Sequence, residues 1–398
     1  MNTMTVDTPQ GHSGTLTDLG SDQFSFRYAP SATDRAAICL SMPTRYADYP
    51  QTGLHPIFQM NLPEGFVLEA LRNRFAKTTS LNPMLLLAMT GRNEPIGRLQ
   101  VDMPGLAPAP VSTGERLADL IAWDGTEDLF EALLDKYILR SGISGVQPKL
   151  LVPESPVDRH TAITGELILK SGGDTWPHLA INEYLCMSIA KAAGLDTPEF
   201  HLSDNGQLFI MRRFDRHENT RLGFEDMAAL MGLAATRKYE GSYEHIARAV
   251  RLFCAPDQVQ VSLQQLFLSI TVSCMVGNGD AHLKNFGLLY SDPTAGDTRL
   301  APAYDIVNTT AYLPNDSLAL KLGGHKSFFA AKLGLLDLAR KLEIENPSAI
   351  VERVLAAIEA TLGSQPDRVE TAPDIAHAIR ASAQPFEAAF LRPRRGGQ

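Results

Sequence analysis

The apolar run LFLSITVSCMV ends at Val276 and passes directly into the polar stretch GNGDAHLKNFGLL, residues 277–289. The longer segment VQVSLQQLFLSITVSCMV would carry apolar residues around a whole helix, so it should be the most buried helix of the chain. The stretch that follows brings four polar side chains into six residues: Asp280, His282, Lys284 and Asn285. The fold must therefore hold a rigid polar loop against its most apolar helix.

The length and composition are those of a globular enzyme. A chain of 398 residues should form two or three domains, and its hydrophobic (44%) and charged (20%) contents are ordinary for such a protein. We expect no membrane association, because no apolar run approaches the roughly 20 residues that a spanning helix needs. The N-terminal sequence lacks the basic and apolar regions of a secretory signal, so a cytoplasmic location is expected.

Cysteine spacing and net charge narrow the class of function. The four cysteines are far apart with no C-x-x-C pair, which argues against a disulfide framework or a zinc site. A net charge of -9 and a pI near 5.6 do not give the basic surface of a protein that binds nucleic acid by itself. The one dense basic cluster is the tail FLRPRRGGQ, and such terminal runs are usually solvated. Contact with DNA should therefore come through a partner.

The proline-rich segment MPGLAPAPVSTGE, residues 103–115, is the predicted linker, because its prolines and small residues oppose both helices and strands. Before it, we predict strands in SFRYA and AAICLSM and a helix in LPEGFVLEALRNRFAK. After it, we predict strands in GELILK and QLFIMRRFDR and helices in EDLFEALLDKYIL, AINEYLCMSIAKAAGLDTP and SAIVERVLAAIEATL. From Phe224 onward the pattern is mostly helical.

The polar loop meets the needs of phosphate transfer from ATP. That reaction uses one carboxylate near the acceptor hydroxyl and further oxygen ligands that hold Mg²⁺ against the phosphates. Protein kinases supply them with D-x-x-x-x-N, and Asp280 and Asn285 stand at that spacing. His282 lies between them, and Lys284 offers a positive charge to a phosphate. Asp305, after the strand-like FGLLYSD, supplies a second metal ligand in the order that kinases use.

Upstream segments add the expected phosphate contacts. Lys170 ends GELILK, where a lysine can reach the ATP phosphates, and Glu183 on the next helix can pair with it. The loop SGISGVQPK carries Gly142 and Gly145, which allow close approach to phosphates, although it matches neither G-x-G-x-x-G nor a Walker A sequence. Two other interpretations stay open, a helix cap with turn residues and a hydrolytic metal site. A cap needs no second aspartate, strand lysine or glycine loop, so phosphate transfer is favoured.

In these motifs the chain resembles the HipA family, the toxin kinases of bacterial type II toxin–antitoxin systems. GNGDAHLKNFGLL is similar to the family's catalytic loop, LAPAYDIVNT to its metal-binding segment, SGVQPKLLV to its glycine-rich loop, and NEYLCMSIAKAAGLDTPEF with RRFDR to its inter-lobe region. FSFRYAP and FQMNLPEG resemble its N-terminal subdomain, so the likeness spans nearly the whole chain. It implies an α+β, bilobal protein-kinase-like fold with an additional N-terminal α/β subdomain and an α-rich C-terminal lobe.

The resemblance also implies boundaries and roles. The regions are a flexible tail (1–20), the N-terminal subdomain (21–112), a kinase N-lobe (113–222), a helical catalytic C-lobe (223–388) and a flexible basic tail (389–398). ATP and Mg²⁺ are the implied cofactors. The implied roles are the catalytic aspartate for Asp280, its partners for His282 and Lys284, Mg²⁺ ligands for Asn285 and Asp305, the ATP-phosphate lysine for Lys170, phosphate contacts for Gly142, Ser144, Gly145 and Lys284, and hinge and ribose contacts for Phe214 and Asp215.

Regulation and partners follow from the same resemblance. Family members commonly phosphorylate a serine of their own glycine-rich loop, but Gly142 stands at the usual serine position, so Ser144 and Ser141 are the candidates here. Ser144 could instead donate a hydrogen bond within the loop. The implied partners are a protein substrate, an aminoacyl-tRNA synthetase such as the glutamyl enzyme, and a HipB-like helix-turn-helix antitoxin that makes the DNA contact. The alternatives are a kinase-fold scaffold or co-repressor that works with such a partner, and a lipid or small-molecule kinase.

Overall fold

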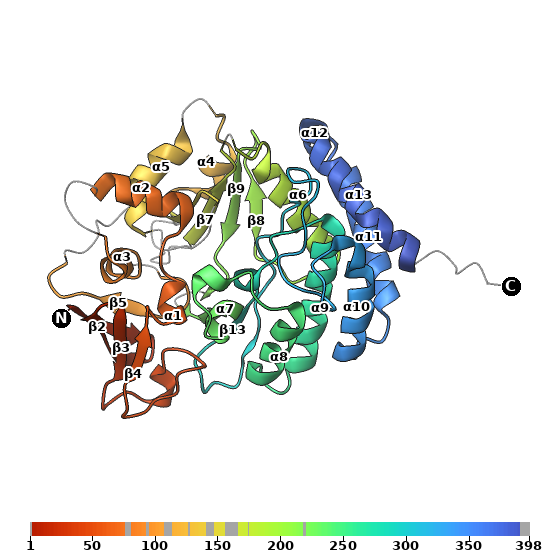
Figure 1. The fold of residues 1–398 in the computed structure, drawn as a ribbon. Coiled ribbons are helices and arrows are strands. Elements are labelled where there is room, and N and C mark those ends of the chain that lie inside the picture. Colours follow the sequence, from red (N-terminus) through yellow and green to blue (C-terminus); the bar gives the residue numbers. More distant parts are fainter. Residues whose placement is uncertain are drawn as a thin grey trace. The chain divides into compact units, whose positions relative to one another are not determined.

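The structure is a computed structural model that describes residues 2–75, 81–92, 95–106, 114–125, 128–140, 147–155, 166–173, 175–217 and 220–390. The chain divides into two compact units and passes between them several times (Figure 1). Unit 1 comprises residues 1–175, 199–237 and 287–299, and unit 2 comprises residues 176–198, 238–286 and 300–398. Helices and sheets both contribute, which confirms the predicted α+β class.

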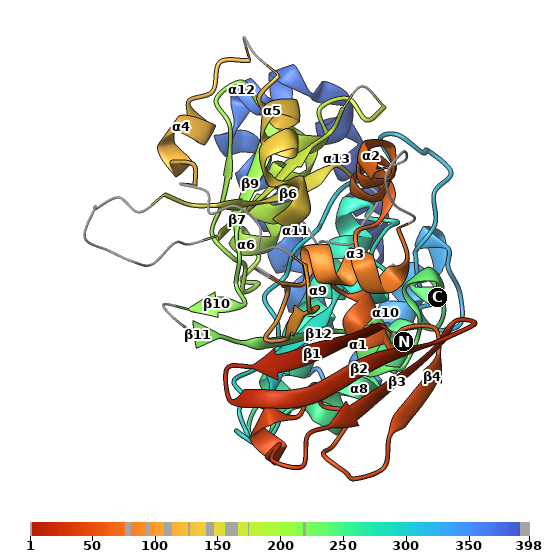
Figure 2. The same ribbon diagram turned by 90° about the vertical axis from the view of Figure 1, so that its left-hand side faces the viewer.

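Unit 1 begins with an antiparallel five-stranded sheet in the order β4-β3-β2-β1-β5 (Figure 2). Its strands are β1 (Asn2–Thr8), β2 (Gly11–Gly20), β3 (Gln23–Tyr28), β4 (Tyr49–Thr52) and β5 (Gln100–Asp102). The prediction of a flexible tail at residues 1–20 is therefore wrong. Met4, Val6 and Leu16 are buried with threonines between them, which is the two-residue period of a strand with one wet face.

The predicted strand in AAICLSM is also wrong. This segment begins with Ala36, the last residue of the short 3₁₀ helix η1 (Asp34–Ala36), and continues in irregular backbone. Ile38 and Cys39 are nevertheless buried. An apolar run indicates burial, and burial alone does not provide a neighbouring strand.

The second sheet of unit 1 is antiparallel, with the order β6-β7-β9-β8. Its strands are β6 (Lys149–Pro153), β7 (Glu166–Ser171), β8 (Phe200–Leu202) and β9 (Leu208–Arg212). The helices α4 (Leu117–Ile121) and α5 (Leu129–Tyr137) cover one face, where Leu120, Leu133 and Tyr137 share a core with the strand leucines. The predicted strands in GELILK and QLFIMRRFDR and the helix in EDLFEALLDKYIL are confirmed.

Shorter elements complete unit 1. The helical ones are α1 (Pro56–Gln59), α2 (Gly65–Phe75), α3 (Pro83–Thr90), η2 (Ile138–Arg140), α7 (Met227–Leu230) and η3 (Ala235–Arg237). The strands are β10 (Arg216–His217), β11 (Thr220–Arg221), β12 (Gly223–Asp226) and β13 (Gly287–Tyr290). The two-residue strand β14 (Arg299–Leu300) has its first residue in unit 1 and its second in unit 2. The helix predicted in LPEGFVLEALRNRFAK is confirmed as α2, and the strand predicted in FGLLYSD is β13, which pairs with β12.

Unit 2 is a helical body built around α9 (Val259–Val276). The other elements are α6 (Leu179–Ala192), α8 (Tyr243–Phe253), η4 (Leu283–Asn285), α10 (Phe328–Leu342), α11 (Pro347–Ser364), α12 (Pro366–Thr371) and α13 (Pro373–Phe390). By length and composition α9 could cross a membrane, with a mean hydropathy of 1.5, but 72% of it is buried in the protein. It is the core helix of this unit, as its composition predicts.

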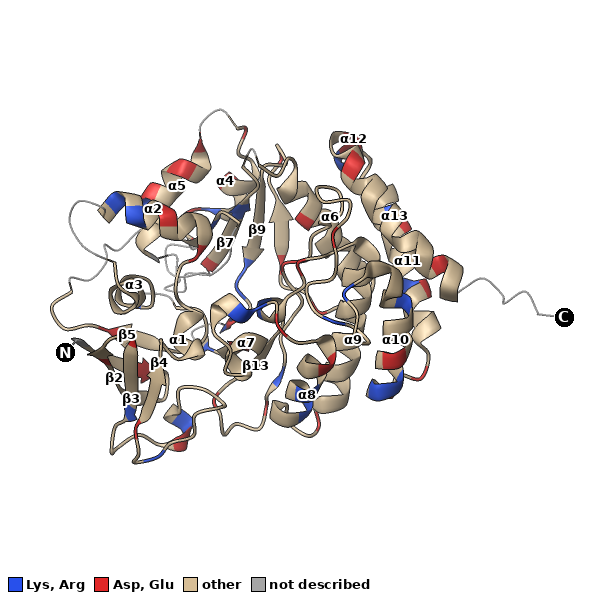
Figure 3. Ribbon diagram, in the orientation of Figure 1, with Lys and Arg blue, Asp and Glu red and all other residues tan. Residues whose placement is uncertain are grey.

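The unit boundaries differ from the predicted lobes. Helix α6 falls in the predicted N-lobe, yet it belongs to unit 2 because it packs on α11 and α9. Strands β12 and β13 fall in the predicted C-lobe but belong to unit 1. Residues 107–113 of the predicted linker and 391–398 of the predicted tail lie outside the described residues. Acidic and basic positions both occur along α8 and α10 (Figure 3).

A buried carboxyl group in unit 1 makes stability depend on pH. The Oε1 atom of Glu225 accepts hydrogen bonds from the Leu40 backbone N–H (2.8 Å) and the Tyr290 hydroxyl (2.6 Å), while its Oε2 atom is buried and has no hydrogen-bond partner among the residues that the structure describes. Burial raises the pKa of Glu225 from 4.5 to about 7. Because the folded state holds the proton more tightly than the unfolded chain, this contribution to stability is complete below pH 4.5 and is lost as pH rises through 7.

We expect Glu225→Gln to remove this pH dependence. The raised pKa corresponds to about 3 kcal/mol of stability lost between acidic and alkaline pH. Urea unfolding of both proteins at pH 5 and pH 8 measures the effect. We expect the difference in the free energy of unfolding between the variant and the parent to become larger toward pH 8. An equal change with pH in the two proteins would contradict this role of Glu225.

Candidate functional site

Two glycines shape the start of the polar loop. Helix α9 ends at Val276 and is capped by Gly277, whose φ of 75° lies in the left-handed region and whose N–H donates to the Ser273 carbonyl. A Cβ atom there would lie 2.7 Å from the Thr310 hydroxyl oxygen, and one at Gly279 would overlap the Asp316 carboxylate. Glycine is thus required both by the backbone turn and by the close packing of segment 309–316 against the loop. Thr309 closes this contact, because its hydroxyl accepts from the Gly279 N–H at 2.7 Å.

The loop brings Asn285 against Asp305. The 3₁₀ turn η4 follows His282, whose backbone N–H donates to Asn285 Oδ1 at 3.1 Å. The Nδ2 atom of Asn285 then donates to Asp305 Oδ2 at 2.9 Å. Within unit 2, the spacing of the loop therefore sets two candidate metal ligands from separate segments side by side.

Asp305 is held in an unusual backbone conformation. Its φ of 59° is left-handed, which a non-glycine residue adopts only at some cost and which is common at functional sites. The following segment is fixed by Asn308, whose side chain donates to the Val276 carbonyl at 2.6 Å. Asn182 of α6 exchanges two 2.7 Å hydrogen bonds with the Asn308 backbone. The two buried asparagines join α6, the end of α9 and the segment of Asp305. Both lie in motifs quoted above, but the sequence analysis gave neither of them a role.

Asp280 is held by hydrogen bonds of its side chain and of its backbone. It is partly buried, and its Oδ1 atom accepts a hydrogen bond from the Tyr239 hydroxyl at 2.7 Å. Its backbone N–H donates to Asn278 Oδ1 at 3.0 Å, and its carbonyl accepts from the His282 N–H at 2.7 Å. The sequence analysis missed Tyr239, because it lies 41 residues before Asp280 and outside every motif.

The two remaining loop residues have different surroundings. The buried His282 ring meets the edge of the Tyr239 ring, with centroids 5.1 Å apart. Lys284 is partly buried, and its carbonyl accepts from the Tyr304 hydroxyl at 2.6 Å. The structure thus gathers Asp280, His282, Lys284, Asn285 and Asp305 in unit 2.

The pair Asn285 and Asp305 fits a metal that is shared with a nucleotide. Mg²⁺ is commonly held through one or two side-chain oxygens, with phosphates and waters completing an octahedron. Among the described residues there is no group of three or more His, Cys, Asp or Glu side chains arranged for a metal. An amide beside a carboxylate therefore suits a metal brought with ATP phosphates better than a metal enclosed by protein alone.

Unit 1 carries the predicted phosphate lysine. Lys170 is buried near the end of β7, opposite Lys149 of β6 and Phe209 of β9, and its Nζ atom lies 5.7 Å from the centroid of the Phe209 ring. Glu183 belongs to unit 2, so its pairing with Lys170 stays a prediction. The predicted loop residues Ser141, Gly142, Ser144 and Gly145 lie outside the described residues.

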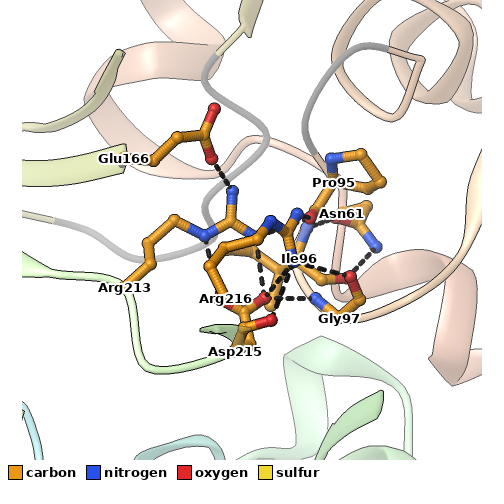
Figure 4. A network of polar contacts seen from close by, with 8 residues as sticks. All are labelled: Asn61, Pro95, Ile96, Gly97, Glu166, Arg213, Asp215 and Arg216. Atoms are coloured by element: carbon orange, nitrogen blue, oxygen red, sulfur yellow. Dashed lines mark hydrogen bonds and ion pairs between the residues drawn. The ribbon is translucent and has the colours of Figure 1, made fainter. Parts of the chain in front are cut away.

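Asp215 lies in a buried ionic network of unit 1 (Figure 4). Its carboxylate accepts from Arg213 Nε at 2.9 Å, from Arg216 Nη1 at 3.0 Å and from the Gly97 N–H at 2.7 Å. Burial alone would raise the pKa of Asp215, but Arg213 and then Arg216 outweigh it and lower the pKa to about 2. The Asp215 carboxylate therefore links Arg213 and Arg216 to the backbone of Gly97. The predicted contact of Asp215 with a ribose stays a prediction.

Arg213 extends this network. It forms an ion pair with Glu166 of β7 and donates to the Pro95 carbonyl at 2.6 Å. Phe214, the predicted hinge residue, is partly buried and packs its ring on Phe224 at 5.4 Å. The network joins residues 95–97, β7 and the segment after β9 within unit 1.

A small antiparallel sheet with a buried strand lysine, and a helical unit whose D-x-x-x-x-N loop meets a second aspartate, define a protein-kinase-like fold. Two family models identify the particular kind. The HipA-like C-terminal domain matches residues 141–362, and the HipA N-terminal domain matches residues 4–102. The chain belongs to the HipA family. The second match includes most of the first twenty residues, in agreement with strands β1 and β2.

Individual relatives agree with this assignment. The Sinorhizobium fredii protein named "Putative kinase Y4dM" is 28% identical over 357 residues, or 80% of each chain. The serine/threonine-protein kinase toxin HipA of Shewanella oneidensis is 27% identical over 270 residues, 60% of this chain and 61% of that one. A chain in the solved complex of the Shewanella oneidensis toxin–antitoxin system HipA, HipB and operator DNA has a TM-score of 0.71 at 19% identity, with 97% of both chains covered. That likeness confirms the HipA fold.

Proposed function

We propose that this protein is a kinase that transfers the γ-phosphate of ATP to serine or threonine residues of a protein. The observation that carries the proposal is the direct contact of Asn285 with Asp305, on the loop that also bears Asp280. A helix cap does not need this contact. Membership of the HipA family, with relatives named as kinases, supports the same activity.

Each residue has a defined part in the proposed reaction. Mg²⁺ bound by Asn285 and Asp305 would neutralise charge on the ATP phosphates. The Asp280 carboxylate accepts the proton of the acceptor hydroxyl as its oxygen forms a bond to the γ-phosphorus and the bond to ADP breaks. Lys284 and Lys170 supply positive charge to the phosphates.

The biological setting proposed is a toxin–antitoxin pair in the cytoplasm. A relative is named a kinase toxin, and the solved complex contains HipA, HipB and operator DNA. We propose a HipB-like helix-turn-helix antitoxin as the partner that contacts DNA, which suits a chain with a net charge of -9. The proposed target is an aminoacyl-tRNA synthetase such as the glutamyl enzyme, so that phosphorylation inhibits translation and growth. Autophosphorylation of Ser144 or Ser141 would silence the kinase.

A second candidate function is a scaffold or co-repressor that works with the helix-turn-helix partner without transferring phosphate. The same complex with operator DNA favours it, because a HipA chain is part of that assembly.

The test is transfer of label from γ-labelled ATP to a bacterial lysate. We expect label on phosphoserine or phosphothreonine of a few proteins, and its loss when EDTA removes Mg²⁺. Label on lipids or metabolites alone would assign the chain to another kinase class. If nothing is labelled while operator binding with the partner persists, the scaffold function is correct and the kinase proposal is wrong.

A further inference from the structure

A segment outside every sequence motif lies along the catalytic loop. We call residues 238–243 the strap. The Lys238 carbonyl accepts from the Leu283 N–H at 3.1 Å, and the Tyr243 hydroxyl donates to the Ala281 carbonyl at 3.1 Å. Between these two contacts, the Tyr239 hydroxyl reaches Asp280. The strap and the loop both belong to unit 2, so these contacts lie within one compact body.

The strap is itself anchored from its other side. The Gly241 carbonyl accepts from the Lys321 N–H at 3.3 Å, and the Tyr239 carbonyl accepts from Lys326 Nζ at 3.3 Å. Hydrogen bonds to the Lys238 and Gly241 carbonyls, on either side of Tyr239, fix the position of the backbone from which the Tyr239 side chain extends. The position of the Tyr239 ring beside Asp280 therefore does not depend on the hydroxyl alone.

The position of Tyr239 is determined by specific contacts of its ring and hydroxyl rather than by packing in the hydrophobic core. Its side chain is 44% exposed, so burial in the core does not account for its position. Its ring meets the His282 ring edge-on, and the Lys238 Nζ atom lies 5.3 Å from its centroid. The ring is thus held by its neighbours, and its hydroxyl is directed at the carboxylate that the kinase proposal makes the proton acceptor.

We propose that Tyr239 is a positioning residue for phosphate transfer, holding the Asp280 carboxylate in the orientation in which it accepts the proton of the acceptor hydroxyl. The inference rests on the proposed kinase function. A partly exposed aspartate can rotate about two side-chain bonds, whereas proton transfer requires a hydrogen-bond distance and a defined direction. The hydrogen bond from the Tyr239 hydroxyl to Asp280 Oδ1 restricts that rotation. Because its acceptor is a carboxylate, this hydrogen bond is charge-assisted and stronger than one between neutral groups.

The test is Tyr239→Phe, which removes the hydroxyl and keeps the ring. We expect kcat for phosphate transfer to fall about 10- to 100-fold, because small displacements of a catalytic group have effects of that size. The KM for ATP and the Tm should stay at the parent values, since the ring contacts remain and the side chain is partly exposed. Tyr46→Phe is the matched control. Because Tyr46 is 96% exposed, removal of its hydroxyl should leave the kcat, the KM for ATP and the Tm at the parent values.

A double variant separates positioning from a structural role. In the Asp280→Asn background, Tyr239→Phe should cause no further loss of rate, because the group that it orients is already disabled. An unchanged kcat for Tyr239→Phe, or a loss confined to Tm or KM, would overturn the inference while leaving the kinase function in place. Absence of any transfer by the parent protein would overturn both.

Discussion

Replacing Arg213 with alanine should lower the free energy of unfolding by roughly 3–5 kcal/mol, because it removes the buried guanidinium that pairs with two buried carboxylates. The Arg213 side chain is 1% exposed, and the side chains of its partners Glu166 and Asp215 are 4% and 5% exposed. Glu166 would lose its ion pair with Arg213, while Asp215 would keep its ion pair with Arg216. Urea unfolding at neutral pH measures the loss.

Two further variants define the cause of that loss. Arg213→Lys keeps the charge but cannot bridge Glu166, Asp215 and the Pro95 carbonyl together, so an intermediate loss is expected. Arg380→Ala breaks an exposed ion pair with Glu359 and should change stability far less. If Arg213→Ala were as stable as Arg380→Ala, the network would not stabilise unit 1.

Asp305→Asn should lower phosphate transfer by roughly a thousandfold, because removing a metal-bound carboxylate forfeits several kcal/mol of charge stabilisation. Asparagine tolerates the left-handed backbone at this position and keeps the size of the side chain, so the fold should be preserved. The measurement is the initial rate of transfer as a function of Mg²⁺ concentration, with the midpoint shifted to higher Mg²⁺.

The exposed Asp257 provides the control for this change, because Asp257→Asn removes the same charge at a site away from the loop. Its rate and Mg²⁺ dependence should equal those of the parent protein. An unchanged Mg²⁺ dependence in Asp305→Asn would remove Asp305 from the metal site and leave Asn285 without its proposed partner.

Patterns of neighbouring residues in the sequence correctly predicted several helices and strands of the fold. Helix α9 has the bounds of the apolar segment, and β7 and β9 follow from short apolar runs. The spacing from Asp280 to Asn285 fixes a short loop, and Asp305 follows in the kinase order. These features depend on residues that are near one another in sequence.

The missed features depend on residues that are distant in sequence. Asn182 and Asn308 are 126 positions apart, and Gly97 and Asp215 are 118 positions apart. In a sequence, an asparagine is typical of a turn, and its burial becomes apparent only when its hydrogen-bond partner is known. The motif RRFDR contains Asp215, Arg213 and Arg216, but it does not show that the Asp215 carboxylate also accepts from the distant Gly97 N–H. The strands of residues 2–20 were also missed, although Met4, Val6 and Leu16 alternate with threonines in the two-residue period of a strand.

We propose above that Asp280 serves phosphate transfer on the loop that follows α9. The most direct measurement is transfer by purified Asp280→Asn and by the parent protein, each incubated with ATP and Mg²⁺ and followed by intact mass and by labelling of a lysate. A positioned general base contributes about 10²- to 10⁴-fold, so we predict a loss of that size with unchanged Tm. Equal transfer by the two proteins would contradict the assignment of this loop as the catalytic site.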